Sequence, residues 1–233
     1  MERQPNSYFR VVVLISGRGS NLRALVEASL SGAAPYRIVG VLSDKGDAAG
    51  LTFAAEHGIP TSVVPRRPKS QDAKQFNKAL AEAAAGFQPD LIVLAGFMRI
   101  LGSEFIGAFP NRIINIHPSL LPAFPGLHVQ QQALDAGVKF SGATVHLVVE
   151  EVDAGPILAQ AVVPVLPGDN AELLAARILR QEHRLLPAVV RRLACGDLRI
   201  EVNESGTTVI TDSQGIAAQS EFPSAADALR SIE

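Results

Sequence analysis

The feature that most constrains the fold is an apolar run near the start of the chain that ends in a glycine-rich segment. Residues 10–16 read Arg-Val-Val-Val-Leu-Ile-Ser, a β-branched run typical of a strand buried on both faces. Residues 17–21 are the turn formers Gly-Arg-Gly-Ser-Asn, and Leu22, Leu25 and Val26 follow at helical spacing. A strand, a glycine loop and a helix in this order open a doubly wound α/β unit.

The same alternation continues through the first half of the chain. Strand-like apolar runs lie at 37–43, 61–64, 91–95 and 112–116, and helical patterns lie at 48–57, 72–87 and 102–109. Strands that alternate with helices predict a mostly parallel, twisted sheet with helices on both faces. We therefore expect an α/β, Rossmann-like fold.

The second half predicts a change in strand pairing. Residues 118–128 carry three prolines and a glycine and are expected to form a loop, before a helix at 129–136. Strands expected at 141–149 and 157–163 are joined by the short sequence Asp-Ala-Gly-Pro at 153–156. A link this short favours antiparallel pairing, so the predicted sheet is mixed.

A long helix and a hairpin are expected to close the fold. Asp169 and Glu172 form a capping-box pattern ahead of the helix, and Pro187 is expected to kink it or to start a new one. Strands at 198–202 and 207–211 flank turn-forming residues and predict a hairpin.

Length and composition indicate one globular domain. The chain has 233 residues, of which 47% are hydrophobic and 19% charged, enough for a packed core. We expect an N-terminal extension at 1–9, one domain at 10–212 and a polar C-terminal tail at 213–233. The net charge of −2 gives no electrostatic footprint for nucleic acid or an anionic membrane, so local donors must hold any anionic substrate.

The single cysteine, Cys195, excludes an intramolecular disulfide and any metal site built on several cysteines. We expect it to be a small buried side chain at a helix end. The N-terminus lacks the apolar core of a signal peptide, and no apolar run is long enough to cross a membrane. The expected location is cytoplasmic. A homodimer stays open, because the sequence does not indicate an oligomeric state.

The loop at 17–21 has two interpretations. Backbone N–H groups between a strand and a helix, beside the positive end of the helix dipole, suit a phosphate. The spacing is neither a dinucleotide-binding fingerprint nor a Walker loop, so a plain tight turn with a Ser or Asn cap is the alternative.

Asn115 and His117 form the strongest candidate pair. Alternate residues of a strand share a face, so both side chains point the same way at the carboxyl end of a predicted strand. Ligands bind at that end of an α/β sheet, and an amide donor beside an imidazole can support proton transfer. The alternative is a strand end at which the two residues only satisfy a turn and cap a loop.

Further candidates are weaker in isolation. Thr144 and His146 alternate on another strand, and Asp153 lies in the turn that follows; ordinary strand and turn chemistry explains them equally well. Residues 96–101, Gly-Phe-Met-Arg-Ile-Leu, place apolar side chains where a loop is expected. They could line a pocket for an aromatic ligand or simply face the core.

These segments occur together, in one order, in a known family. The chain carries Ser-Gly-Arg-Gly-Ser-Asn-Leu at 16–22, Ala-Gly-Phe-Met-Arg-Ile-Leu at 95–101 and Asn-Ile-His-Pro-Ser-Leu-Leu-Pro at 115–122. Phe-Pro-Gly at 124–126, Gly-Ala-Thr-Val-His at 142–146 and Asp-Ala-Gly-Pro-Ile at 153–157 follow. Between about Arg10 and Thr211 the chain closely resembles the folate-dependent glycinamide ribonucleotide formyltransferases of purine biosynthesis.

The resemblance implies a role for each group of residues. The catalytic set would be Asn115, His117 and Asp153, supported by Thr144 and His146. Substrate would be bound by Gly19, Ser20, Asn21, Pro118, Glu182 and Lys74, the first three at the phosphate. Folate would be bound by Met98, Arg99, Ile100, Leu101, Val148, Val149, Glu150 and Val152. The implied reaction transfers a formyl group from 10-formyltetrahydrofolate, a co-substrate, to glycinamide ribonucleotide, with no metal.

One departure and one alternative accompany this resemblance. Family members usually carry an arginine near the start of the helix after the third strand, but residues 70–76 contain none. Lys74 lies closest to that position, and Arg66 and Arg67 precede it. The alternative function is a non-catalytic regulator of the same fold that binds phosphorylated sugars or folates. Formyl-methionyl-tRNA synthesis and formyltetrahydrofolate hydrolysis are disfavoured, since each would need an additional domain.

Overall fold

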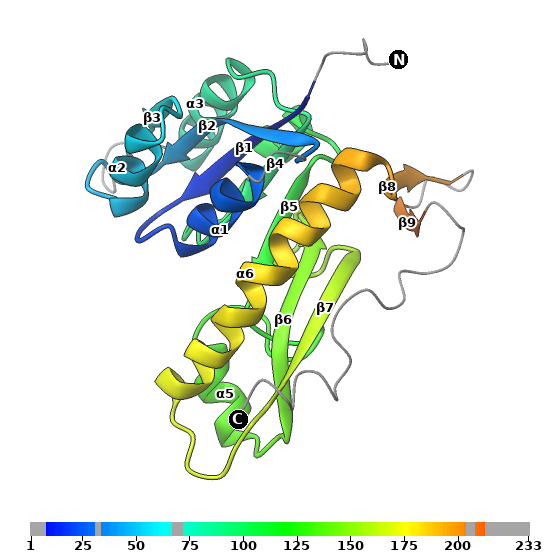
Figure 1. The fold of residues 1–233 in the computed structure, drawn as a ribbon. Coiled ribbons are helices and arrows are strands. Elements are labelled where there is room, and N and C mark those ends of the chain that lie inside the picture. The colour runs from blue at the N-terminus through cyan, green and yellow to red at the C-terminus, as the bar shows by residue number, and fades with distance from the viewer. Residues whose placement is uncertain (1–7, 31–33, 67–71, 204–207, 213–233) are drawn as a thin grey trace. The chain divides into compact units, whose positions relative to one another are not determined.

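The structure, a computed structural model, describes residues 8–30, 34–66, 72–203 and 208–212. The expected C-terminal tail, 213–233, and residues 1–7 of the expected N-terminal extension lie outside the described residues. The elements of the chain follow the predicted alternation of strands and helices (Figure 1).

Strands and short helices alternate up to the middle of the chain. They are β1 (Phe9–Ile15), α1 (Ser20–Ser29), β2 (Tyr36–Ser43), α2 (Ala49–Glu56), β3 (Thr61–Val63), α3 (Ala73–Ala85), β4 (Leu91–Leu94), α4 (Ser103–Ala108) and β5 (Ile113–His117). The later elements are α5 (Val129–Asp135), β6 (Phe140–Leu147), β7 (Ile157–Pro164), α6 (Ala171–Cys195), β8 (Leu198–Val202) and β9 (Thr208–Asp212).

The strands form a seven-stranded sheet in the order β3-β2-β1-β4-β5-β6-β7 and a separate two-stranded sheet, β8-β9. Strand β1 pairs in parallel with β2 and β4, and β2 pairs in parallel with β3. Strands β6 and β7 pair antiparallel, as do β8 and β9. The predicted mostly parallel sheet, its antiparallel part and the hairpin are therefore confirmed.

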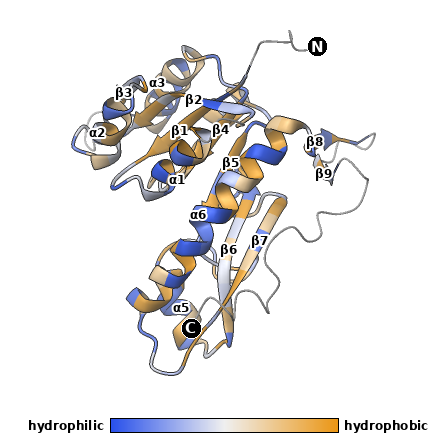
Figure 2. Cartoon of the chain, in the orientation of Figure 1, coloured by the Kyte–Doolittle hydropathy of each residue, from blue (hydrophilic) through white to orange (hydrophobic). Residues whose placement is uncertain are grey.

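Two compact units divide the chain, 1–114 and 115–233, and the boundary falls within β5. In the first unit, residues Val11 to Ile15 of β1 are completely buried, as their β-branched pattern predicts. Figure 2 shows this strand as hydrophobic, whereas the helices of the unit mix apolar and polar residues. The first unit therefore has its core around the strands that the sequence marks most clearly.

The second unit is organised around α6, which packs against β6 and β7. Its buried side chains recur every three or four residues and include Leu174, Ile178, Leu185 and Val189. The helix continues unbroken through Pro187, so the expectation that this proline could start a new helix is wrong. Burial of this apolar stripe stabilises the helix more than the loss of one backbone donor at proline weakens it.

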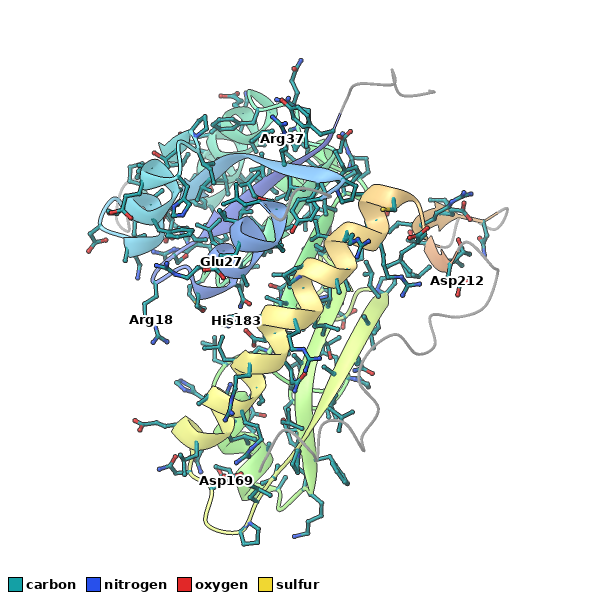
Figure 3. The ribbon with its side chains drawn as sticks, in the orientation of Figure 1. Arg18, Glu27, Arg37, Asp169, His183 and Asp212 are labelled. Atoms are coloured by element: carbon teal, nitrogen blue, oxygen red, sulfur yellow. The ribbon has the colours of Figure 1, made fainter. Side chains whose placement is uncertain are left out.

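The predicted capping box at the start of α6 is also wrong. The N-cap is Asn170, whose Oδ1 accepts a hydrogen bond from the backbone N–H of Leu173 at 2.9 Å. Asp169 lies just before the helix (Figure 3) and forms a bidentate ion pair with Arg177, at 2.6 and 2.9 Å. The hydrogen bond from Arg177 lowers the pKa of Asp169 below its ordinary value. At the other end of α6, Cys195 is exposed, not buried as expected.

Gly142 shows why one glycine is required inside β6. A Cβ atom at this position would collide with the backbone carbonyl oxygen of Ala161 on β7 and lie 2.7 Å from Cδ2 of Leu120. The Leu120 side chain could rotate away, but the contact with the Ala161 backbone cannot be relieved without moving the strand pairing. Gly107 in α4 is exposed, and a Cβ there would meet no atom within 4 Å.

Gly142→Ala should therefore lower the free energy of unfolding by about 2 kcal/mol or more, as overpacking of a tight interior does. Gly107→Ala, the matched control, should be neutral or stabilising by up to about 1 kcal/mol, because alanine favours a helix. Chemical denaturation of both variants measures the difference. Equal stability of the two variants would contradict the close approach of β6 and β7.

Candidate active site

The side chains of Asn115 and His117 lie on the same face of β5, as predicted, and each meets a different polar group of the second unit. Nδ2 of Asn115 lies 3.1 Å from Nε2 of His146 on β6. The His117 ring is only 4% exposed, and its Nε2 lies 3.0 Å from the carbonyl oxygen of Phe124. The two residues thus point into a polar cluster rather than into a simple turn.

Asp153 completes this cluster by facing both imidazole rings. Its Oδ2 lies 3.5 Å from Nδ1 of His117, and its Oδ1 lies 3.6 Å from Nε2 of His146. The backbone N–H of Gly126 donates to Oδ2 at 2.9 Å. Asp153 adopts a left-handed conformation (φ 55°), which non-glycine residues adopt chiefly in turns and at functional sites. The structure therefore brings together Asn115, His117, His146 and Asp153.

Hydrogen bonding assigns the tautomer of His146. Its Nδ1 lies 3.0 Å from the carbonyl oxygen of Leu147, which can only accept, so Nδ1 carries the hydrogen. Burial lowers the pKa of His146; the Leu147 carbonyl and the Asp153 carboxylate oppose this shift, and His117 adds to it. The neutral ring then presents the lone pair of Nε2, which accepts from the amide of Asn115. His146 is thus suited to orient Asn115 rather than to exchange protons itself.

The same argument gives His117 the complementary role. Its Nε2 donates to the carbonyl oxygen of Phe124, so Nδ1 is the atom that gains or loses a proton. When protonated, Nδ1 forms an ion pair with the Asp153 carboxylate. His117 therefore presents Nδ1 to the Asp153 carboxylate, a geometry that suits general acid–base chemistry.

Thr144 holds the loop after β5. Its hydroxyl donates to the carbonyl oxygen of Ser119 at 2.7 Å and accepts from the backbone N–H of Leu121 at 3.0 Å. The side-chain amide of Gln160 on β7 donates to the same hydroxyl and to the carbonyl oxygen of Leu121. Because this loop carries the Phe124 carbonyl that fixes His117, Thr144 supports the ring indirectly.

The glycine loop of the first unit forms the start of α1. Gly19 is the N-cap residue and has φ 74°, so the next residues, Ser20 and Asn21, present the first N–H groups of the helix. A Cβ at Gly19 would lie 2.8 Å from Cα of Gly50 in α2. Arg18 extends away from the loop (Figure 3) and is exposed. The geometry is that of a helix start that follows a left-handed glycine.

Residues 96–101 present their side chains alternately. Met98 and Ile100 are 64% and 74% exposed, whereas Phe97 and Leu101 are buried in the first unit. Arg99 is half-buried and donates from Nε to Asp44 at 2.6 Å. Of the residues expected to bind folate here, Met98 and Ile100 therefore offer apolar side chains, and Leu101 could offer only its backbone.

The remaining predicted site residues have diverse surroundings. Lys74 is exposed in the first turn of α3, Glu182 is buried in α6, and Pro118 is half-buried after β5. After β6, Val148 and Val149 are half-buried, and Glu150 and Val152 are exposed. The roles expected for these residues stay predictions.

Two backbone groups of the cluster were not predicted. The carbonyl of Phe124 and the N–H of Gly126 fix His117 and Asp153, respectively. The sequence at 124–126 carries only a weak signal, because its Phe-Pro-Gly turn formers indicate a loop without indicating what the loop's backbone contacts.

In the ranges described, no group of three or more His, Cys, Asp or Glu side chains could hold a metal ion. Within the same ranges, no helix combines the length and apolar character needed to span a bilayer.

The family model described as formyl transferase matches residues 9–190. A phosphoribosylglycinamide formyltransferase from Mycobacterium tuberculosis is 48% identical over 190 residues, which are 82% of this chain and 87% of that protein. A trifunctional purine biosynthetic protein, adenosine-3, from Bos taurus is 44% identical over 194 residues, which are 83% of this chain. The chain spans only 19% of that longer relative.

Solved structures agree with the sequence comparison. The crystal structure of glycinamide ribonucleotide transformylase 1 from Symbiobacterium toebii matches with a TM-score of 0.81 and 45% identity. The match covers 91% of this chain and 99% of that structure. The likeness therefore includes nearly the whole fold and not only the motifs.

The lowered pKa of His146 predicts a pH-dependent stability. As pH falls below about 6.5, the unfolded chain protonates this residue before the folded chain does, so the free energy of unfolding falls. One such group contributes at most about 1.4 kcal/mol per pH unit. Denaturation of wild type and His146→Gln at pH 7.5 and 5.5 should show a smaller loss in the variant. The same loss in both proteins would show that His146 protonates as readily when folded.

Proposed function

Because the chain belongs to the formyl transferase family, we propose that it is a phosphoribosylglycinamide formyltransferase. It transfers the formyl group of 10-formyltetrahydrofolate to the amine of glycinamide ribonucleotide. The products are formylglycinamide ribonucleotide and tetrahydrofolate, in de novo purine biosynthesis. The observation that carries this proposal is the position of Asp153, whose carboxylate faces the rings of His117 and His146 beside the amide of Asn115.

This cluster suits a reaction through a tetrahedral intermediate. The substrate amine attacks the formyl carbon, a C–N bond forms, and the carbonyl oxygen becomes an oxyanion. One N–H of Asn115 is oriented by His146, and its second N–H donates to that oxygen. The imidazolium of His117 stabilises the same negative charge, and Asp153 balances the charge of the ring.

Collapse of the intermediate requires two proton movements. The bond between the formyl carbon and the folate nitrogen breaks, and His117 supplies the proton that this nitrogen takes up. The attacking amine loses a proton, which Asp153 accepts through a water molecule. Neither step requires a covalent enzyme intermediate, and no metal takes part in the proposed route.

The substrate phosphate is assigned to the glycine loop. Gly19 caps α1 in a left-handed conformation, and the N–H groups that follow it are typical of anion sites at helix starts. Ser20 and Asn21 add side-chain donors, and Glu182 is assigned to the glycinamide portion. The folate is assigned to residues 98–101 and to the valines and Glu150 after β6.

The presence of the complete cluster argues against a non-catalytic regulator. A protein that only bound folate or a phosphorylated sugar would need neither a carboxylate that faces two buried imidazoles nor a tautomer held by backbone carbonyls. Burying such groups costs free energy, which a catalytic role explains.

Asp153→Asn should lower kcat by about a hundredfold or more while both substrates still bind, because the amide keeps the shape but cannot balance an imidazolium. Steady-state kinetics measure the change in kcat, and calorimetry measures the affinity for each substrate. If affinity falls in proportion to the rate, Asp153 shapes the site and is not catalytic.

A direct test of the proposed reaction measures folate release when glycinamide ribonucleotide is added. Its dephosphorylated form should react with a kcat/KM lower by about a thousandfold, because two or three charge-assisted hydrogen bonds are lost.

Lys74→Ala should reduce the preference for the phosphorylated substrate, whereas Lys78→Ala, the matched control at an exposed position on the same helix, should not. Equal rates with both forms would show that the loop is only a turn and that the assigned substrate is wrong.

Gly19→Val is a poor probe of phosphate binding. The residue has φ 74°, and its Cβ would press against the backbone of Gly50. A substitution there would therefore distort the loop whether or not a phosphate binds. Ser20→Ala removes one donor without this distortion and is the better variant.

A further inference from the structure

Residues 96–102 are held in place by buried polar side chains from three other elements of the first unit. This segment follows β4 and is not itself a helix or a strand. Its backbone is bonded to Ser16 after β1 and to Asn77 in α3, and its arginine is bonded to Asp44 after β2.

Ser16 is the central anchor. Its hydroxyl accepts a hydrogen bond from the backbone N–H of Met98 at 2.8 Å and donates to Oδ1 of Asp44 at 2.6 Å. Its own backbone N–H donates to the carbonyl oxygen of Gly96 at 3.1 Å. Ser16 is 4% exposed, so water competes little for these bonds.

Asp44 connects this anchor to the arginine of the segment. Its side chain is 0% exposed, and its second oxygen, Oδ2, accepts from Nε of Arg99 at 2.6 Å. A buried carboxylate is costly unless it is fully paired, and pairing it is often no more stabilising than an apolar replacement. Asp44 therefore contributes to the geometry of the segment, because its one carboxylate fixes both the Ser16 hydroxyl and the Arg99 side chain.

Asn77 fixes the far end of the segment. Its Oδ1 accepts from the backbone N–H of Gly102 at 2.9 Å, while its Nδ2 donates to the carbonyl oxygen of Ala73 within α3. Asn77 is 4% exposed. The segment is therefore tethered at both ends by groups that solvent barely reaches.

The result is a fixed backbone that presents apolar side chains outward. Met98 and Ile100 are the two most exposed of these, while Phe97 and Leu101 on either side are buried. A surface ordered in advance binds a ligand with a smaller loss of conformational entropy than a mobile loop does. This arrangement fits a wall for an aromatic ligand.

We infer that Ser16 and Asp44 are positioning residues for the folate co-substrate, a role that depends on the function proposed above. They act through Met98 and Arg99, and neither is assigned to contact the reacting atoms. Removing the Ser16 hydroxyl leaves the Met98 N–H without its acceptor and Oδ1 of Asp44 without its donor. The segment then loses its order before any folate binds.

The test compares Ser16→Ala and Asp44→Ala with wild type. Each should raise the KM for 10-formyltetrahydrofolate by about five- to tenfold, the worth of one or two buried hydrogen bonds. The kcat and the KM for glycinamide ribonucleotide should change less than about twofold. Amide hydrogen exchange at Met98, measured without folate, should become faster in both variants. Asp44→Asn, which keeps an acceptor for Arg99 and a donor toward Ser16, should restore much of the affinity.

Tyr36→Phe is the matched control. It removes another buried hydrogen bond of the first unit, from the tyrosine hydroxyl to the carbonyl oxygen of Leu25, and leaves residues 96–102 untouched. It should lower stability without changing the folate KM or the exchange at Met98. A folate KM that rises equally in this control would show a general loss of stability and overturn the inference.

The remaining outcomes separate the two proposals. Wild type that neither binds 10-formyltetrahydrofolate in calorimetry nor transfers its formyl group overturns the proposed function, and the inference with it. Wild type that binds the folate, with Ser16→Ala binding it equally well, overturns the inference alone. Unchanged exchange at Met98 in Ser16→Ala overturns it as well, because the hydroxyl would then not hold the backbone.

Discussion

The candidate site depends on a single carboxylate shared between two buried imidazole rings. Asp153 faces His117 and His146, and the two rings differ in which nitrogen a backbone carbonyl holds. The Phe124 carbonyl holds Nε2 of His117, which leaves Nδ1 facing Asp153. The Leu147 carbonyl holds Nδ1 of His146, which leaves Nε2 to accept from the amide of Asn115. Hydrogen bonds alone therefore suit two chemically identical side chains to different roles in the proposed reaction.

The sequence predicts the parts of the fold that follow from local patterns. The buried run of β1 and the alternation of strands and helices were sufficient for the mostly parallel sheet, which the structure confirms. The shared strand face of Asn115 and His117 follows from the period of a strand. By contrast, the start of α6 was misassigned, because Asp169 and Asn170 are equally good caps, and Asp169 is instead bonded to Arg177 and to the backbone of Leu166.

Other features depend on contacts between distant residues and leave little signal in the sequence. The left-handed turn at Asp153, the carbonyl of Phe124 and the buried Asp44 acquire their roles only once separate segments meet. The resemblance to a family supplied the set of site residues that periodicity alone left undecided. It did not supply the hydrogen bonds that separate the roles of the two histidines, since those come from the backbone of one loop and one strand.

The contact between Gly19 and Gly50 has a consequence for sequence change in this chain. A Cβ on either residue would press on the backbone of the other, and the N–H of Gly50 also donates to the carbonyl oxygen of Gly17. The shape of the first βα loop is therefore set partly by the second helix, about thirty residues away in the chain. Transplanting the loop alone into another scaffold would not carry its conformation with it. A transplant that includes α2 would keep the contact between the two glycines.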